Sequence, residues 1–266
     1  MQASFVDIHC HLLPGIDDGA SDWDATLAMA RMAVADGIRT IIVTPHQQGN
    51  FATNLGDDIR RQTTELQNRL IHAEIPLTVL PGADVRIEDG MLERLASGVV
   101  LSLADHRRHV LLELPHELYF PLEPLLKLLR QQSLVGILSH PERNRGILSR
   151  PELIAPLVAQ GCLMQITAGS LMGTFGPDSQ KLAESMLVQG TVHFLATDAH
   201  SPTRRRPLMQ RAFQRIYELT DERTACLLCM QNPAQVARGE TVSSHLSDYS
   251  VPPRGWRRLF SRKKAG

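Results

Sequence analysis

A chain of 266 residues is long enough for one large α/β domain or two small ones. Hydrophobic residues make up 43% and charged residues 21%, an ordinary balance that places the chain in the globular class. No apolar run approaches the roughly 18 residues that span a bilayer, and no basic stretch followed by an apolar run opens the sequence. We therefore expect the protein to stay in the cytoplasm.

The formal net charge of zero conceals an uneven distribution. The final stretch, RGWRRLFSRKKAG, carries six basic residues and no acidic one, which leaves 22 basic against 28 acidic residues elsewhere. An acidic body argues against a nucleic-acid partner, because phosphate backbones require a basic face. We expect one domain over residues 1–243 and a flexible basic tail over residues 244–266.

The tail interleaves two aromatic residues, Trp256 and Phe260, with its basic residues. Such a segment suits weak contact with an anionic membrane surface. The alternative is a solvated, disordered end, which short charge runs of this kind usually are.

Apolar runs and helical stretches alternate along the body of the chain. Strands are predicted at residues 5–9, 38–46, 76–85, 109–114, 134–139, 162–167 and 191–200. Helices are predicted at residues 24–37, 122–133, 152–161 and 179–190. About seven strands, separated mostly by helices, indicate an α/β fold with a parallel sheet and helical crossovers. No linker or repeat divides the body, so a single domain is the simplest interpretation.

Eight polar residues share one feature, because each lies at or just beyond the carboxyl end of a predicted strand. They are His9, His11, His46, Asp84, Glu113, His140, Asp198 and His200. In a β/α barrel this is the face on which active sites are built. Burying imidazoles and carboxylates there is costly unless they are paired or bind cations. A shared metal cluster explains all eight together.

Two pairs of these residues have the spacing of a strand. In DIHCH, alternation sends His9 and His11 to the same side, along with Asp7. TDAH repeats the arrangement with Asp198 and His200 at the far end of the body. The first and last strands of a closed barrel are neighbours, so both pairs should meet. Imidazoles with carboxylates suit Mn²⁺, Fe or Zn²⁺, and no thiolate cage is present.

Other motifs are weaker when taken singly. PGIDDGA places Asp17 and Asp18 in a turn, and a plain Asp–Gly turn is the structural alternative. TPH ends a β-branched run at His46, for which a capping histidine is the alternative. SHPERNR joins His140 to Arg143 directly after an apolar run.

Competing catalytic signatures do not fit. The four cysteines are too few and too irregular for a disulfide framework, and the CxxC at Cys226 and Cys229 fits one face of a helix. Cys10 lacks the arginine of a C-x5-R phosphatase, because Ile16 occupies that position. Phosphate loops, dinucleotide fingerprints and nucleophile elbows are absent from the sequence. The glycine-rich TAGSLMGTFG is equally consistent with a structural loop and a substrate-facing lid.

Taken together, DIHCHLLPGIDDGA, TPH, GADVRI, LLELP, SHPERNR, QITAGSLMGTFG and ATDAH resemble the polymerase-and-histidinol-phosphatase (PHP) superfamily. More narrowly, they are similar to the bacterial CpsB/CapC-type tyrosine-protein phosphatases of capsule and exopolysaccharide operons. The resemblance runs in order from about Val6 to Glu240 and covers most of the chain. It implies a distorted, TIM-like (β/α) barrel with three metal ions, usually manganese.

The resemblance also implies roles for individual residues. One ion would be held by His9, His11, Asp198 and a bridging Asp84, a second by this bridge with Glu113 and His140, and a third by Asp18, His46 and His200. Arg143 and Arg205 match arginines that grip phosphate. The expected metal is Mn²⁺, with two or three ions per chain and Fe or Zn²⁺ as alternatives.

Two positions depart from the family pattern. Asp84 stands where the family usually has Glu, so the bridge must sit closer to the ions or one site is weakened. Gln47 follows His46 where the family has a second histidine, which should alter the surroundings of the site rather than the number of metals.

The implied activity is metal-dependent hydrolysis of phosphotyrosine on proteins. The implied partner is an autophosphorylated, membrane-anchored bacterial tyrosine kinase that controls capsule or exopolysaccharide synthesis. Two alternatives stay open: a PHP-type phosphatase for a small monoester such as histidinol phosphate, and a non-catalytic regulator that binds a phosphorylated kinase. The full set of metal-binding residue types argues against the regulator.

Overall fold

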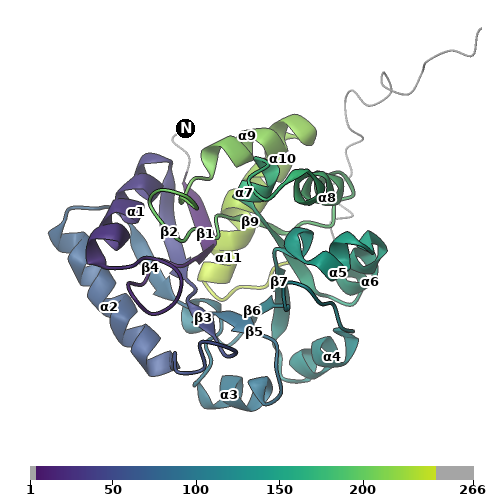
Figure 1. Cartoon of the computed structure of the whole chain (residues 1–266), viewed down its shortest axis with the longest axis horizontal. Coiled ribbons are helices and arrows are strands. Elements are labelled where there is room, and N and C mark those ends of the chain that lie inside the picture. The colour runs from purple at the N-terminus through teal and green to yellow at the C-terminus, as the bar shows by residue number, and fades with distance from the viewer. Residues whose placement is uncertain (1–3, 244–266) are drawn as a thin grey trace, which may run out of the picture.

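The computed structural model describes residues 4–243, with strands at the centre and helices around them (Figure 1). The strands are β1 (Phe5–Cys10), β2 (Ile38–Val43), β3 (His46–Gln47), β4 (Thr78–Pro81), β5 (Asp84–Arg86), β6 (His109–Glu113), β7 (Val135–Ser139), β8 (Leu163–Thr167) and β9 (Phe194–Ala196). All pair in parallel. The predicted basic tail, with its membrane contact, lies outside the described residues.

The strands form two hydrogen-bonded sheets, with the orders β1-β2-β4 and β3-β5-β6-β7-β8-β9. A parallel bridge between Cys10 and Ala199 joins the end of β1 to the segment that follows β9. There the amide of His11 donates to the carbonyl of Ala199 at 2.9 Å, and that of Asp198 to the carbonyl of His9 at 2.8 Å. The first and last strand runs are therefore neighbours, as predicted, and the α/β class with a parallel, barrel-like arrangement is confirmed.

Nine strands replace the predicted seven, because two of the predicted runs are each divided in two. Thr44 and Pro45 separate β2 from β3, and residues 82–83 separate β4 from β5. Pro45 has no N–H to donate to a ladder. A Cβ at Gly82 would lie 2.7 Å from the side chain of Ile42, so the chain passes β2 too closely for any side chain. The division places β2 and β4 in one sheet, and β3 and β5 in the other.

The predicted helices are present within a larger set. The set comprises α1 (Trp23–Ala35), α2 (Gly56–His72), α3 (Met91–Ser97), α4 (Glu123–Gln131), α5 (Arg145–Leu148), α6 (Ile154–Ala159), α7 (Ala168–Leu171), α8 (Pro177–Val188), α9 (Gln210–Leu219), α10 (Glu222–Cys226) and α11 (Asn232–Ala237). Short 3-10 turns η1 (Leu103–Asp105), η2 (Pro141–Arg143) and η3 (Pro151–Leu153) and a π-helical turn η4 (Leu227–Gln231) complete it. Within residues 4–243 no helix is long and apolar enough to cross a membrane.

The ends of α1 show how the sequence sets its bounds. The carboxylate of Asp22 accepts from the amide of Ala25 at 2.8 Å, which satisfies one of the unpaired N–H groups of the first turn. The helix ends just before Gly37, whose φ of 100° is a backbone conformation that glycine adopts without strain. The chain then turns directly into β2.

A small apolar cluster fills the centre of the strand arrangement. Leu111, Ile137 and Leu163 of three neighbouring strands belong to it, together with Val236 of α11, and all are buried. Side chains alternate along a strand, so residues two positions further on face the same way. On β6, β7 and β8 those residues are polar: Glu113, Ser139 and Gln165. The apolar cluster therefore forms the floor of a polar site.

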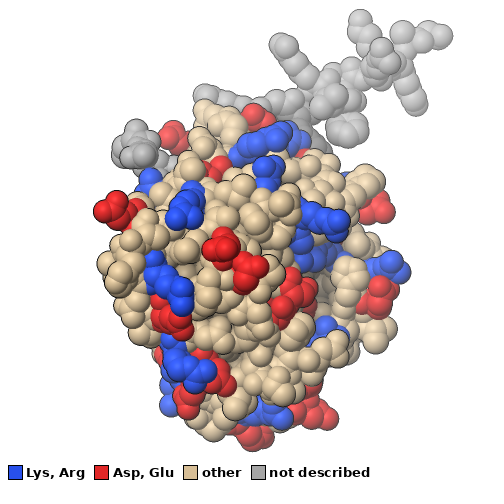
Figure 2. Space-filling view, turned by 60° about the vertical axis from the view of Figure 1, so that its left-hand side comes forward, with Lys and Arg blue, Asp and Glu red and all other residues tan. Residues whose placement is uncertain are grey.

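The outer surface carries mixed charge. Figure 2 shows basic and acidic side chains interspersed over one face of the molecule. On α2, Arg60 pairs with Asp57 and Arg69 with Glu65, each with a nitrogen–oxygen distance of 2.7 Å. Such exposed pairs contribute at most about 1 kcal/mol each, so they support solubility more than stability.

Candidate metal centre

All nine predicted metal-binding residues lie together. They form four overlapping groups in which one nitrogen or oxygen atom of each residue lies within 4.8 Å of the others. The groups are His11, Asp18, His46 and His200; His9, His11 and Asp84; His9, His140 and Asp198; and His46, Asp84 and Glu113. Residues from the two ends of the domain therefore share one site.

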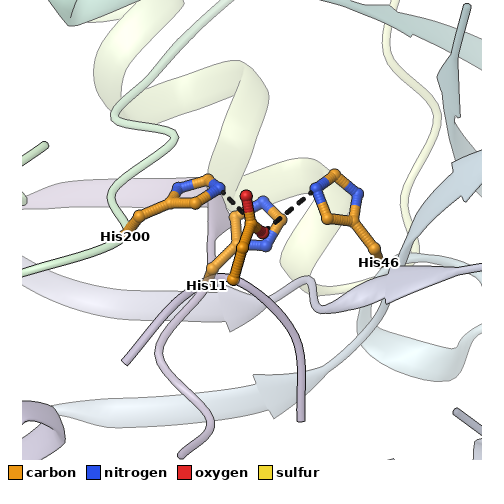
Figure 3. Close-up of side chains that lie close together, drawn as sticks. His11, His46 and His200 are labelled. Atoms are coloured by element: carbon orange, nitrogen blue, oxygen red, sulfur yellow. Dashed lines mark ion pairs between the residues drawn. The ribbon is translucent and has the colours of Figure 1, made fainter. Parts of the chain in front are cut away.

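The first group combines three histidines from distant segments. Figure 3 shows the rings of His11, His46 and His200 converging on one point. The Asp18 carboxylate lies there, with Oδ1 3.5 Å from Nε2 of His46 and 3.4 Å from Nε2 of His200. The ring centroids of His11 and His200 are 3.9 Å apart. Four ligand-type side chains thus face a common centre.

His9 belongs to two of the remaining three groups. Its Nε2 lies 3.2 Å from Nε2 of His11, 3.2 Å from Oδ1 of Asp198 and 3.6 Å from Oδ2 of Asp84. His140 lies on the other side, with its ring centroid 5.5 Å from that of His9. By distance, His140 belongs with His9 and Asp198, whereas the family resemblance implied a place beside Glu113.

Asp84 occupies the middle of the arrangement. Besides His9, it faces Nδ1 of His46 at 3.4 Å, and the same Nδ1 lies 3.6 Å from the carboxylate of Glu113. Asp84 on β5 and His46 on β3 are direct partners in the parallel ladder, which explains why they meet. The carboxylate is thus placed to serve two of the groups.

Two of these residues have an unusual backbone. His140 directly after β7 has φ 33°, and Asp198 just after β9 has φ 51°. Residues with a Cβ adopt this left-handed region only at a cost of about 1–3 kcal/mol, and such strain clusters at functional sites. The conformation turns both side chains toward His9 at points where the strands have ended.

The donor atoms fit a divalent cation. Asp84 is fully buried, yet neither of its oxygens accepts a hydrogen bond from any described residue. A buried carboxylate without donors is costly unless a positive charge lies beside it. Burial and the charge of Asp84 also raise the pKa of Glu113 to about 7. Imidazole nitrogens with carboxylate oxygens, and no thiolate, suit Mn²⁺, Fe or Zn²⁺.

Three of the five histidines in the site are held in the neutral form that binds metal. Burial lowers the pKa of His200 to about 4, with the neighbouring His11 acting in the same direction. Burial likewise lowers the pKa of His9, and of His140 well below its usual range. Neutral imidazole carries the free lone pair that a metal ion needs. In the other two histidines, neighbouring carboxylates outweigh burial. Asp17 and Asp198 raise the pKa of His11 to about 10, and Asp84 raises that of His46.

Outer residues orient the rings. Nδ1 of His9 lies 2.8 Å from Oε1 of Gln165, and Nδ1 of His11 lies 2.7 Å from Oδ2 of Asp17. Each contact leaves Nε2 of its ring facing the centre, as partners behind metal-binding histidines commonly do. Asp17 also accepts from the amides of Gly19 at 2.9 Å and His46 at 3.0 Å.

Sequence reasoning missed the roles of Asp17 and Gln165. A plain Asp–Gly turn already accounted for Asp17, so nothing in the local pattern required a second role. Gln165 is the one polar residue in the apolar run at residues 163–166, and it is buried. A buried amide requires a hydrogen-bond partner, so this was the one signal in the sequence that Gln165 contacts a polar group.

Two further buried carboxylates, Asp7 and Glu142, accept hydrogen bonds from segments that surround the site. Asp7 accepts from the amide of Thr197 at 3.0 Å and belongs to none of the four groups, although alternation placed it on the same side as His9. Burial raises its pKa to about 6. Glu142 of the HPER motif accepts from the amide of Thr167 at 2.9 Å and the hydroxyl of Ser170 at 2.7 Å. It thereby links HPER to the TAGS motif.

Both predicted phosphate-binding arginines lie at the edge of the cluster. Arg143 and Arg205 donate to the same oxygen, Oδ2 of Asp198. Nε of Arg205 is buried and has no hydrogen-bond partner within residues 4–243. The pair therefore presents positive charge and a free N–H donor beside the ligand-type residues.

Comparisons with known proteins agree with this geometry. The sequence model of a family described as capsular polysaccharide synthesis, CpsB/CapC, matches residues 5–238. The chain belongs to the CpsB/CapC family. Among its curated relatives, the tyrosine-protein phosphatase YwqE of Bacillus subtilis is 41% identical over 198 residues, 74% of this chain and 77% of YwqE. The putative tyrosine-protein phosphatase CapC of Staphylococcus aureus is 31% identical over 78% of this chain and 82% of CapC.

Solved structures extend the comparison. A crystal structure from work on YwqE of Bacillus subtilis and CpsB of Streptococcus pneumoniae, described as metal-dependent tyrosine phosphatases, matches with a TM-score of 0.86. It is 36% identical and covers 93% of this chain and 98% of that chain. A lactonase of Listeria monocytogenes, 13% identical with a TM-score of 0.60 over 90% of this chain and 96% of that chain, shares the fold alone.

Gln47, one of the two departures of this CpsB/CapC member, serves as a structural bracket. Its Nε2 donates to the carbonyls of Asn54 at 2.7 Å and Val99 at 3.0 Å, and its Oε1 accepts from the amide of Leu101 at 2.7 Å. The side chain is buried and joins three segments on the side of β3 away from the cluster, as alternation with His46 requires.

The cysteines of this CpsB/CapC member do not join the site. Cys10 packs in the apolar core, with Sγ 3.9 Å from the carbonyl of Ala199, and burial raises the pKa of its thiol well above the usual range. It turns away from the histidines on either side, as predicted. Cys226 ends α10, and the buried Cys229 lies in the π-helical turn η4, so the predicted helix carries an irregular turn there.

Proposed function

We propose that this CpsB/CapC member hydrolyses phosphotyrosine on proteins with divalent metal ions. The strongest support is that nine ligand-type residues lie in one site and that two arginines lie at its edge. Bound metal ions and the guanidinium groups would then face a phosphate from two sides. The relatives named above as tyrosine-protein phosphatases support the choice of substrate.

We propose that the ions are held by His9, His11, Asp18, His46, Asp84, Glu113, His140, Asp198 and His200. Mn²⁺ is the proposed metal, with Fe or Zn²⁺ as alternatives that the same donor set accepts. Divalent ions would supply Lewis acidity toward the phosphoryl oxygens and lower the pKa of a water molecule toward neutrality.

The protein's own contribution is to hold the phosphate and fix its orientation. The guanidinium groups of Arg143 and Arg205 would bind non-bridging phosphate oxygens, where planar N–H donors match the geometry of the anion. Their shared contact with Asp198 keeps both directed at the cluster before substrate arrives. Such preorganised donors stabilise charge in the transition state without reorganisation.

The leaving group of a phosphotyrosine ester is a phenolate, which reduces the need for a general acid, and we assign none. Phenols have a pKa of about 10, so a phenolate leaves more easily than an alkoxide and depends less on protonation. We further propose that the physiological substrate is an autophosphorylated tyrosine kinase anchored in the inner membrane.

The decisive experiment joins metal analysis to a substrate panel. Full-length protein, assayed with a phosphotyrosine peptide, a phosphoserine peptide and histidinol phosphate, should contain bound divalent metal and favour the phosphotyrosine peptide. Preference for histidinol phosphate would indicate a small-molecule phosphatase. Absence of turnover in fully metal-loaded protein would indicate a binding protein and overturn the proposal.

A further inference from the structure

Phe175 contacts both arginines of the site. It lies in the segment between α7 and α8. The guanidinium carbon of Arg143 lies 4.1 Å from the centroid of the Phe175 ring, and that of Arg205 lies 5.7 Å from it. The two guanidinium groups therefore share two neighbours, the Asp198 carboxylate and this ring.

Gly169 leaves the space that the Phe175 ring occupies. Gly169 lies within α7, outside the left-handed region, so its backbone does not require glycine. A Cβ at this position would lie 2.8 Å from Cε2 of Phe175, closer than packed atoms approach. The amide of Thr174 donates to the carbonyl of Gly169 at 2.9 Å, which fixes the turn that carries the ring. The missing side chain at 169 thus makes room for Phe175.

The contact suits an arginine that must bind an anion. An aromatic face attracts a cation through its quadrupole. Stacking uses the flat face of the guanidinium and leaves its in-plane N–H groups free for an oxyanion. A second carboxylate in the place of the ring would instead compete with phosphate for those donors.

The ring also acts where the two arginines repel each other. Arg143 and Arg205 carry like charges and converge on one oxygen of Asp198. A phosphate that accepts hydrogen bonds from the same N–H groups would compete with the Asp198 carboxylate for them. The Phe175 ring carries no net charge, so it neither repels the guanidinium groups nor competes with phosphate for their N–H donors.

We propose that Phe175 is a positioning residue that holds Arg143, and with it Arg205, in the orientation that receives the phosphate. The inference rests on the proposed phosphatase function. Phe175 itself contributes no proton and no charge. The TAGSLMGTFG segment then has a defined role, because its glycine and its aromatic residue form one wall of the phosphate site.

The direct test replaces the ring with an aliphatic side chain. Phe175→Leu keeps apolar packing against Gly169 but removes the aromatic face. In full-length, metal-loaded protein it should lower kcat/KM by about 10-fold, within the range of one cation–π contact. The loss should be equal for an aryl and an alkyl phosphate, and inhibition by inorganic phosphate should weaken by a similar factor. Phe175→Tyr should retain activity, while metal content and Tm stay near wild type in both variants.

A double-mutant cycle separates positioning from general packing. In an Arg143→Ala background, Phe175→Leu should cost little further activity, because its effect passes through the missing arginine. Trp23 provides a matched control, since Arg69 lies 4.1 Å from its ring centroid on the outer helices. Trp23→Leu should leave inhibition by inorganic phosphate unchanged.

Several outcomes would overturn the inference. Penalties that add in the double variant would mean that Phe175 acts independently of Arg143. A loss confined to aryl phosphates would mean that the ring contacts the substrate's ring. Should wild-type protein prove inactive, the proposed function fails, and calorimetric binding of inorganic phosphate to metal-loaded Phe175→Leu still decides the positioning role.

Discussion

Strand β6 carries an ionisable residue at each end, and the two differ in whether polar groups surround them. His109 at the first position is buried, and neither ring nitrogen has a hydrogen-bond partner among the described residues. Burial, with the nearby charge of Arg108, lowers the pKa of His109 to about 4. Glu113 at the last position faces His46 and Asp84. One strand therefore carries a buried imidazole without a described hydrogen-bond partner at its start and a partly exposed member of a polar cluster at its end.

Strand β9 repeats the contrast. His193, immediately before it, accepts from the amide of Met164 at Nδ1 over 3.0 Å and so connects neighbouring segments. Asp198 and His200, just after it, belong to the candidate metal centre. Residue type alone does not decide the role of a histidine here. The carboxyl ends of parallel strands gather polar groups from several strands at one edge, and the amino ends do not.

The largest expected effect follows from this contrast. His9→Ala, His140→Ala or Asp198→Ala should lower bound metal and reduce activity by more than about 10²-fold, the upper range for loss of an outer metal partner. EDTA should silence the wild type, and Mn²⁺ should restore it. Metal analysis and phosphatase assays measure both effects.

His109→Leu is the control for that prediction, because it removes a buried histidine from the amino end of β6, outside the candidate metal centre. It should retain metal and activity. Full activity in thoroughly metal-stripped wild-type protein would contradict the comparison altogether.

The next effect concerns the arginines. Arg143→Ala or Arg205→Ala should lower kcat/KM by about 10²-fold, as expected when one donor to a developing charge is lost. Metal content and Tm should stay near wild type. Arg204 is the internal control, since it is adjacent in sequence but makes no contact with Asp198 among the described interactions. An Arg204→Ala variant that is crippled instead would reassign the phosphate contact.

A moderate effect on the pH dependence of stability is expected for His109, at the amino end of β6. The folded pKa of His109, about 4, lies below its ordinary value of 6.5, so between these values the unfolded chain binds more protons. The stability contributed by neutral His109 is fully present above about pH 6.5 and is lost as pH falls toward 4. His109→Leu should flatten this slope in denaturant unfolding measured across that window. An unchanged slope would show that His109 is not its source.

The smallest effects are expected at two conservative changes. Asp84→Glu introduces the longer carboxylate that the family resemblance led us to expect at this position, and it should preserve activity and metal retention or improve retention. Cys10→Ser should leave activity near wild type, because the thiol faces the core. Metal-to-protein ratios test the first change, and assays under reducing conditions test the second. Inactivation by Cys10→Ser alone would contradict the whole metal-centre interpretation.

Sequence patterns alone determined the parallel α/β arrangement and eight of the nine ligand-type residues, because a strand's period and its carboxyl end are visible in one chain segment. The ninth, Asp18, lies in a bend outside the strands and was named only through the family resemblance. His9 and His11 could be named because alternation places both on one side of a strand. The same logic correctly turned Cys10 away.

Only the tertiary structure decided how these residues are grouped and what holds them. The division of the runs at Pro45 and Gly82 depends on which strands pass close together. The role of Asp17 depends on its 2.7 Å contact with His11, and that of Phe175 on two arginines from other segments. Distances between segments far apart in the chain are set by packing, and local sequence periodicity carries no record of them.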